Sequence, residues 1–159
     1  MINIKFIVLG NIKESYLRDA IAEYTKRLGA FAKVEICELK EYKLPDNPSQ
    51  SHIDAALEDE AQRILAAIPP RSHVMALAVE GKQMSSEELA EHIESVTQTA
   101  STVCFVIGSS HGLSQKIKNA ANYKLSLSKM TFPHQLFRVM LLEQVYRAFN
   151  IIKGTKYHK

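Results

Sequence analysis

Hydrophobic residues along this chain follow two alternating spacings, one typical of buried strands and the other of amphipathic helices. Short apolar runs rich in β-branched residues predict strands. They fall at Ile2–Leu9, Lys33–Leu39, His73–Val79 and Thr102–Ile107, and Leu125 with Leu127 indicates a last strand. Between these runs, and again after the last one, apolar residues recur at three- and four-residue spacing, which predicts helices.

The predicted helices are bounded by residues that favour helix ends, such as Gly29, the Pro69–Pro70 pair and a capping box. The expected helices are Glu14–Leu28, a stripe from Ile53 to Leu65, one opened by the Ser85–Glu88 capping box, Ser114–Ala121, and a last one from Pro133 to Gly154. The segment Lys40–Ser51 contains two prolines and is predicted to be a loop.

Strands that alternate with helices predict an α/β fold, with a mostly parallel sheet and helices on both of its faces. We expect a single domain spanning residues 1–159, since the chain has no internal repeat and no linker. The last helix is apolar around much of its circumference, so it should pack against more than one surface. In such sheets, ligands bind beyond the carboxyl ends of the strands. The loops after Val79, Ile107 and Leu127 are therefore the candidate binding loops.

The charge is strongly uneven along the chain. Residues 116–159 hold nine lysines and arginines against one acid, Glu143, a net charge of +8. The whole chain carries +3, so residues 1–115 carry −5. A basic C-terminal segment of this kind favours a polyanionic partner, although a solvated basic surface is the alternative.

Several classes of protein are disfavoured by composition. No apolar run is long enough for a membrane span, and the apolar N-terminus contains Lys5 and lacks a signal-peptide cleavage site. Cys37 and Cys104 lie in strand-like runs and are expected to be buried thiols, and no metal site is expected from the histidine and cysteine spacing. We therefore expect a cytoplasmic protein without a membrane or metal partner.

The glycine-rich segment Gly108–Gly112 matches the G-x-S-x-G pattern of hydrolases, in which Ser110 would be the nucleophile. The order of acidic and histidine residues after it fits that mechanism poorly. A turn that needs glycine for its backbone geometry and a ligand-binding loop are the two other interpretations. No Walker motif is present, because no Gly-Lys-Ser/Thr follows.

The segment from Leu127 to Phe132 links the last predicted strand to the last helix. Such a junction exposes backbone amides and carbonyls that can bind a purine edge, while Leu127, Met130 and Phe132 offer apolar walls. Spacing alone favours ordinary core residues here. In the tail Tyr157–Lys159, His158 has the chemistry to move a proton at neutral pH, although a solvated tail is the simpler interpretation.

Together these segments resemble one family closely. The matching parts are Val74–Lys82, Phe105–Leu113, Leu125–His134, Arg138, Glu143–Ala148 and Tyr157–Lys159. They are similar to the ribosomal large-subunit pseudouridine N3-methyltransferase family, a small group within the SPOUT methyltransferases. The resemblance covers Ile2 to Lys159, and the Leu125–His134 block with the terminal Tyr157–His158 pair is its most specific part.

This resemblance implies an α/β fold whose C-terminal part forms a deep trefoil knot, a rare exception to unknotted topology. It implies a homodimer that binds S-adenosylmethionine and methylates N3 of a pseudouridine in helix 69 of 23S ribosomal RNA, on assembled ribosomes. By position, the cofactor contacts transfer to Leu77, Gly108, Leu127, Ser128, Lys129, Met130, Thr131 and Phe132. The rival interpretations are a SPOUT methyltransferase acting on another RNA such as tRNA, and a non-catalytic ribosome-binding module.

One position departs from the family pattern. Ser109 stands where the family usually has a second glycine. If that position requires a positive φ, serine is strained there by about 1 kcal/mol. His111 matches no element of the family, and we assign it no role.

The resemblance also suggests roles for the C-terminal residues. His158, helped by Tyr157, is expected to accept or relay the N3 proton, and Arg138 is expected to support the reacting anion. Arg147 and Lys159 are expected to contact RNA. The five residues after Gly154 can extend roughly 17 Å, enough to reach a neighbouring subunit's cofactor.

Overall fold

The computed structural model describes all residues, 1–159, and contains five strands and five helices. In chain order they are β1 (Ile2–Leu9), α1 (Ser15–Leu28), β2 (Ala32–Leu39), α2 (Gln50–Ala67), β3 (Ser72–Gln83), α3 (Ser86–Val96), β4 (Thr102–Val106), α4 (Gln115–Ala120), β5 (Tyr123–Ser126) and α5 (His134–Lys153). Strands and helices alternate strictly, as the apolar spacing predicts.

The five strands form one sheet in the order β2-β1-β4-β3-β5, and every neighbouring pair is parallel. The parallel pairing places the carboxyl ends of β1, β4 and β3 at one edge of the sheet. β4 is buried along its whole length in the centre, which explains its continuous apolar sequence.

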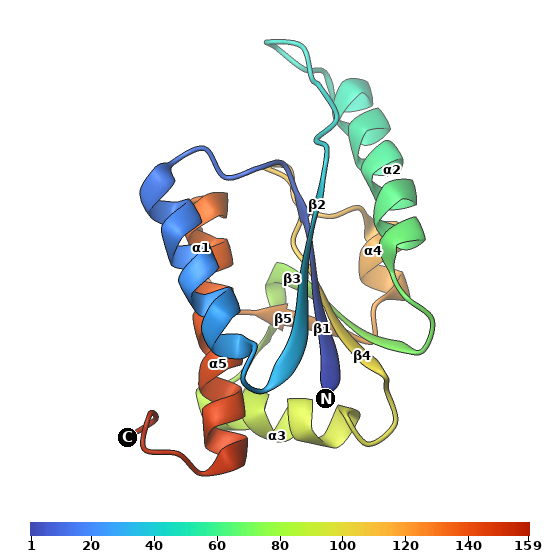
Figure 1. Cartoon of the computed structure of the whole chain (residues 1–159). Coiled ribbons are helices and arrows are strands. Elements are labelled where there is room, and N and C mark those ends of the chain that lie inside the picture. The colour runs from blue at the N-terminus through green and yellow to red at the C-terminus, as the bar shows by residue number, and fades with distance from the viewer.

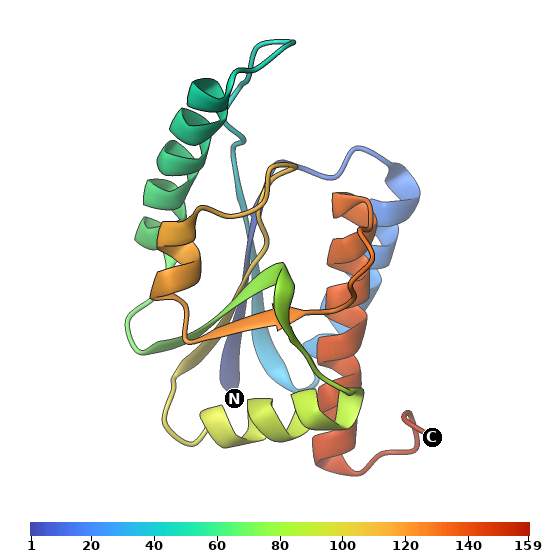
Figure 2. The same cartoon turned by 180° about the vertical axis from the view of Figure 1, so that it is seen from behind.

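Helices cover both faces of the sheet, which confirms the predicted fold class. Alternate residues of β1 and β4, such as Phe6 and Phe105, pack with α1, α3 and α5 in the larger core. The other alternation, including Ile7 and Cys104, packs with α2 and α4 in a smaller core. Figures 1 and 2 show α1 and α5 on one side of the sheet and α2 and α4 on the other. As expected from its apolar circumference, α5 contacts both α1 and α3.

The structure corrects two predicted strand ends. β3 extends to Gln83, beyond the predicted end at Val79, but its pairing with β5 is interrupted, since Leu77 and Lys82 both pair with Leu125. The intervening residues bulge out of the ladder, a feature that apolar spacing does not signal. β5 ends at Ser126, so Leu127 lies outside the strand and begins the segment that leads to α5. The earlier end of β5 lengthens the segment between β5 and α5.

Candidate functional site

The three predicted binding loops meet around one cavity of about 290 Å³ at the carboxyl edge of the sheet. The bulged part of β3 after Leu77 forms one wall, the turn after Ile107 a second, and the segment after Ser126 a third. Of the eight residues assigned as cofactor contacts, all but Lys129 line this cavity: Leu77, Gly108, Leu127, Ser128, Met130, Thr131 and Phe132. Residues far apart in the chain are therefore brought together as one concave site, the usual form of a small-molecule site.

The segment 127–132 keeps its backbone available. None of the backbone hydrogen bonds outside helices and strands involves these residues. Side chains hold the segment instead: the Ser126 hydroxyl donates to the Ser128 carbonyl at 3.0 Å, and the Ser128 hydroxyl accepts from the Met130 amide at 2.9 Å. Pro133 precedes the first residue of α5 and has no amide hydrogen to donate. The free amides and carbonyls can therefore pair with the polar edge of a heterocycle.

Close backbone contacts at two glycines shape this cavity. A Cβ on Gly108 would lie 2.4 Å from the carbonyl oxygen of Gly112, within the same turn. A Cβ on Gly81 would lie 2.8 Å from the carbonyl oxygen of Lys124. Both positions therefore require glycine because the facing backbone leaves no room for a side chain.

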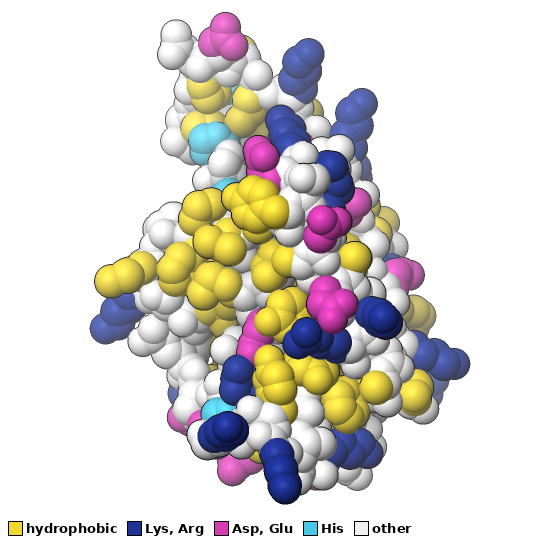
Figure 3. All heavy atoms as spheres, turned by 60° about the vertical axis from the view of Figure 1, so that its left-hand side comes forward, with side chains coloured by type: hydrophobic (Ala, Val, Ile, Leu, Met, Phe, Trp, Pro, Cys, Tyr) yellow, Lys and Arg dark blue, Asp and Glu magenta, His cyan; other side chains and the backbone are white.

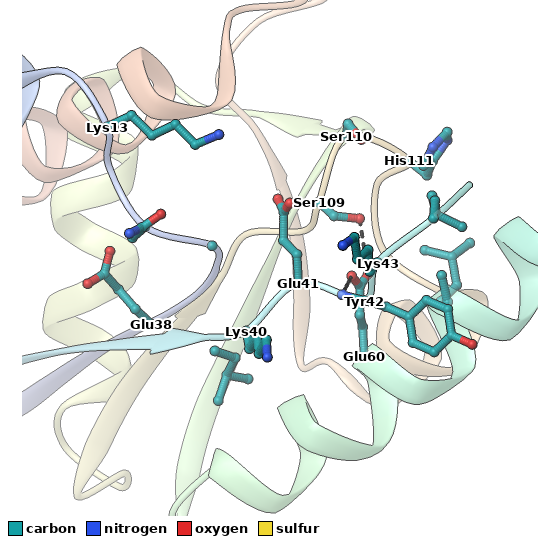
Figure 4. Close-up of a pocket in the computed structure, with 16 residues that line it drawn as sticks. Lys13, Glu38, Lys40, Glu41, Tyr42, Lys43, Glu60, Ser109, Ser110 and His111 are labelled. Atoms are coloured by element: carbon teal, nitrogen blue, oxygen red, sulfur yellow. Dashed lines mark hydrogen bonds between the residues drawn. The ribbon is translucent and has the colours of Figure 1, made fainter. Parts of the chain in front are cut away.

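A second hollow, of about 700 Å³, lies beside the first and shares Ser109 and His111 with it. In Figure 4 the Ser109 side chain points toward Glu60 of α2. The Ser109 hydroxyl donates to Glu60 Oε1 at 3.0 Å, and the Tyr42 amide donates to Oε2 at 3.2 Å. Glu60 is only 4% exposed, so this buried carboxylate ties the glycine turn to the loop after β2.

The backbone conformation of Ser109 shows whether serine is strained at this position of the family pattern. Arg71 is the only residue other than glycine with a positive φ, so Ser109 has an ordinary backbone conformation. The strain considered for serine at this position does not arise. The neighbouring Ser110 is exposed, and its hydroxyl makes no hydrogen bond to a histidine or an acid. Nothing around Ser110 supports the hydrolase interpretation.

The C-terminal tail folds back onto its own chain and forms a polar cluster with α3 and α5. His158 Nε2 lies 2.6 Å from Glu87 Oε1, and its Nδ1 lies 3.2 Å from Arg147 Nη1. The Tyr157 hydroxyl donates to Glu143 Oε1 at 3.1 Å, and Arg147 Nε donates to the same oxygen at 3.1 Å. None of these residues lines the 290 Å³ cavity of the same chain.

This environment keeps Tyr157 protonated. Burial, followed by its hydrogen bond to the Glu143 carboxylate, raises the pKa of Tyr157 to about 12. The Arg147 guanidinium lies 4.8 Å from the centre of the Tyr157 ring. Arg147 thus contacts Glu143, Tyr157 and His158 within its own chain. Its predicted contact with RNA would have to form while these side chains surround it.

Arg138 lies apart from the tail. Its side chain is buried, its Nη2 donates to the carbonyl of Leu9 at the end of β1, and its Nη1 lies 3.5 Å from Glu38 Oε2. The structure therefore does not bring Arg138 together with His158 and Tyr157 in one chain. Sequence reasoning also missed Glu60 and Glu87, since neither lies in a recognisable motif. Glu60 is 49 residues from its partner Ser109, and Glu87 is 71 residues from its partner His158.

The surface around the cofactor cavity is apolar. Val79 and Met130, which line the cavity, are 52% and 75% exposed, and Leu136 of α5 is also exposed. Figure 3 shows hydrophobic side chains gathered on the face that carries α1 and α5. Exposed apolar patches of this kind are typical of interaction surfaces.

The basic C-terminal segment keeps most of its charge free. Four of its nine cations make salt bridges, those of Lys116, Lys118, Arg138 and Arg147. The other five are exposed and make none: Lys124, Lys129, Lys153, Lys156 and Lys159. No group of three or more metal-ligating side chains is present, and no helix combines the length and apolar character needed to cross a membrane.

Three comparisons with known proteins give related results. A family model described as "Predicted SPOUT methyltransferase" matches residues 2–158. Proteins named "Ribosomal RNA large subunit methyltransferase H" are 53% identical over 158 residues in Bacillus pumilus (strain SAFR-032) and 52% identical over 158 residues in Clostridium beijerinckii (strain ATCC 51743 / NCIMB 8052). Each match covers 99% of both chains.

The structural comparison concerns the fold alone. A solved structure titled "The structure of a probable methylase family protein from Haemophilus influenzae Rd KW20" aligns with a TM-score of 0.57 at 15% identity. The alignment covers 99% of this chain and 71% of that one.

Proposed function

Because this chain belongs to the SPOUT methyltransferase family, we propose that it transfers a methyl group from S-adenosylmethionine to N3 of a pseudouridine in helix 69 of 23S ribosomal RNA. The observation that supports this most is the full-length similarity to large-subunit ribosomal RNA methyltransferases, at 53% identity. The substrate is the ribosome or its large subunit, so we place the enzyme in the cytoplasm.

The cavity formed by the three loops fits S-adenosylmethionine. The free backbone groups of residues 127–132 suit the polar edge of an adenine, and Leu77, Leu127 and Phe132 supply apolar walls. Gly108 allows the backbone to approach closely where a side chain would fill the space. When bound, the cofactor supplies an electrophilic methyl group. The task of the protein is then mainly to orient the target nitrogen toward it.

The N3–H proton must leave when the new N–C bond forms. His158 is the imidazole in the tail that would accept it, and Glu87 would stabilise the resulting imidazolium. Tyr157 stays protonated and so acts as a hydrogen-bond donor that positions Glu143 and Arg147. Replacing His158 by Ala should lower turnover by about 100-fold or more while leaving cofactor affinity near wild type. Unchanged turnover would remove His158 from the mechanism.

We also infer that the enzyme works as a homodimer. Within one chain the tail cluster and the cofactor cavity share no residue, while the cavity is bordered by exposed apolar side chains, Val79 and Met130. Pairing of two copies over this surface would bury the apolar side chains and would bring one tail close to the other subunit's cavity. Sedimentation that showed a monomer at micromolar concentration would contradict this.

The deep trefoil knot is part of the same proposal. Two features support it: the part of β3 after Leu77 leaves the ladder with β5 and returns to it at Lys82, and Gly81 packs directly against the backbone of Lys124 and Leu125. Residues of the segment 127–132 line the same cavity as this bulge and the turn at Gly108. A chain threaded between the bulge and the turn would hold the cofactor segment rigidly.

The decisive experiment is incubation with labelled cofactor and ribosomes that lack the modification, followed by mapping of the modified base. We expect one methyl group at N3 of a helix 69 pseudouridine. Transfer RNA and isolated small subunits serve as the controls. Label on transfer RNA would favour the rival substrate, and cofactor binding without any transfer would favour a non-catalytic ribosome-binding module.

A further inference from the structure

A third cavity, of about 440 Å³, lies between α1, the ends of β1 and β2, and the start of α5. Eight of its twelve lining residues are hydrophobic, among them Ile12, Ile21, Ile36 and Leu142. Its volume is in the range usual for small-molecule sites. The feature that sets this cavity apart is the charged side chain that it contains.

That side chain is Arg138, which is only 6% exposed. Its Nη2 donates to the Leu9 carbonyl, but its Nε and Nη1 are buried without a hydrogen-bond partner. Burial lowers the pKa of Arg138, although the carboxylates of Glu38 and Glu41 raise it in part. Glu38 Oε2 lies 3.5 Å from Nη1 and is itself half-exposed at the mouth of the cavity.

Buried donors without acceptors destabilise a fold, and native structures keep few of them. An arginine held this way in an apolar cavity therefore points to an acceptor brought by a ligand. The guanidinium is also held in place, since the Leu9 carbonyl accepts from Nη2 and the Glu38 carboxylate lies 3.5 Å from Nη1.

The cavity adjoins the proposed cofactor site. Ile107 lines both, and the consecutive residues Phe137 and Arg138 of α5 line the cofactor cavity and the Arg138 cavity respectively. Asn11 and Glu38 are shared with the larger hollow drawn in Figure 4, so the Arg138 cavity also opens toward solvent. A ligand in it would lie next to the methyl donor and could enter from outside.

We propose that the Arg138 cavity receives the uracil-type ring of the target nucleotide, with Arg138 donating to a ring carbonyl oxygen. This rests on the proposed function and adds to it the place where the base binds. N3 of such a ring lies between two carbonyl carbons, so a guanidinium that holds one of their oxygens positions the nitrogen that reacts. The flat apolar faces of the ring suit the aliphatic walls of the cavity.

The same geometry predicts a base preference. We place Arg138 on the C4 oxygen, because cytosine carries an amino group at C4 and two donors facing each other would leave the guanidinium unpaired. A ring of the uracil type should therefore bind at least about tenfold more tightly than cytosine. The preference depends on the donors of Arg138, and binding itself depends on free volume in the cavity. One substitution can change the donors and another can fill the volume, so the two requirements can be tested separately.

The test is an NMR titration of the protein with free uridine, pseudouridine and cytidine, in the presence of saturating S-adenosylmethionine. Ala22 of α1 lines only this cavity, and Ala22→Leu fills it with a residue that favours helices. Arg138→Lys keeps the charge but changes the donors. We expect Ala22→Leu to abolish nucleoside binding with unchanged cofactor affinity, and Arg138→Lys to abolish the preference over cytidine.

Two results would overturn the proposal: equal binding of uridine and cytidine by the wild type, or undiminished uridine binding by Ala22→Leu. Neither depends on methyl transfer. A wild-type protein that binds uridine selectively but transfers no methyl group to ribosomes would contradict the proposed function and leave this inference standing. Methyl transfer to ribosomes combined with unselective nucleoside binding would support the proposed function and contradict this inference.

Discussion

Tyr157 and His158 are neighbours in the tail but have opposite chemical characters. The Tyr157 hydroxyl donates to Glu143, which accepts from Arg147 as well, so the phenol is locked as a donor. His158 faces the Glu87 carboxylate instead. In the proposed mechanism the imidazole accepts the proton and the phenol positions Glu143 and Arg147.

The protonation of Tyr157 can be measured directly. Its pKa is raised from 10 to about 12, chiefly by burial, so the folded state favours the neutral phenol. The stability from this preference is complete below pH 10 and is lost as the pH rises toward 12. We expect wild type and Tyr157→Phe to show equal phenolate absorbance gains up to about pH 10, and to diverge only above it. Divergence between pH 9 and 10 would mean that Tyr157 ionises normally.

The buried Glu60 should contribute to stability through Ser109. Replacing Glu60 by Ala leaves the buried Ser109 hydroxyl without its acceptor and should lower the free energy of unfolding by about 1–3 kcal/mol. Ser109→Ala should cost about 1 kcal/mol, and the double variant less than the sum. Urea unfolding measures all three.

The neighbouring Asp59→Ala serves as the control, since Asp59 makes only a surface ion pair with Arg63 and should cost at most about 0.5 kcal/mol. Additive effects of Glu60→Ala and Ser109→Ala would show that the two side chains do not interact in solution.

Single residues were predictable from sequence where the site is continuous in the chain. Ser128 and Phe132 belong to one turn between a strand and a helix, so its motif identified them together. Glu60 is different, because a carboxylate on an ordinary amphipathic helix gives no sign of the distant hydroxyl that it accepts from. Only the packing of α2 beside the glycine turn creates that contact.

At the scale of elements, the turn between β4 and α4 sets the shape of the cofactor cavity. Gly112 has a φ of +81° and open space around it, whereas Gly108 faces the Gly112 carbonyl at a distance that admits no Cβ. The two glycines of one turn therefore serve different purposes, which the shared motif could not distinguish.

This difference predicts unequal effects of alanine. Gly112→Ala should cost about 1–2 kcal/mol from backbone strain and leave cofactor affinity nearly unchanged. Gly108→Ala must push the turn apart and should weaken S-adenosylmethionine binding by at least about tenfold. Calorimetric titration of both variants checks this. Equal affinities would show that the turn opens easily and does not shape the site.

The order of elements was predictable because each has a strong local pattern, such as the capping box at Ser85. The bulge in β3 was not, since it arises where Gly81 meets the backbone of β5, a contact between strands that are consecutive in the sheet but not in the chain. Local spacing predicts which segments are strands, and only tertiary contact decides where pairing is interrupted.

For the whole molecule, the charge asymmetry seen in the sequence persists in the fold. Acids of residues 1–115 pair with three cations of the C-terminal segment and Glu143 pairs with a fourth, while five cations remain exposed without a salt bridge. Two of these, Lys156 and Lys159, flank the Tyr157–His158 pair. Free cations beside the proposed proton acceptor should hold RNA phosphates near the reaction.

Ribosome binding should therefore depend steeply on salt, and the tail should account for part of that dependence. Each phosphate contact adds about 0.7–0.9 to the slope of log affinity against log salt. We expect Lys156→Gln with Lys159→Gln to reduce the slope by about 2, measured by filter binding over a salt series. Lys26→Gln with Lys33→Gln removes the same charge from α1 and β2, outside the basic C-terminal segment, and should leave the slope nearly unchanged. If both pairs reduce it equally, attraction depends on net charge alone and the tail makes no phosphate contacts of its own.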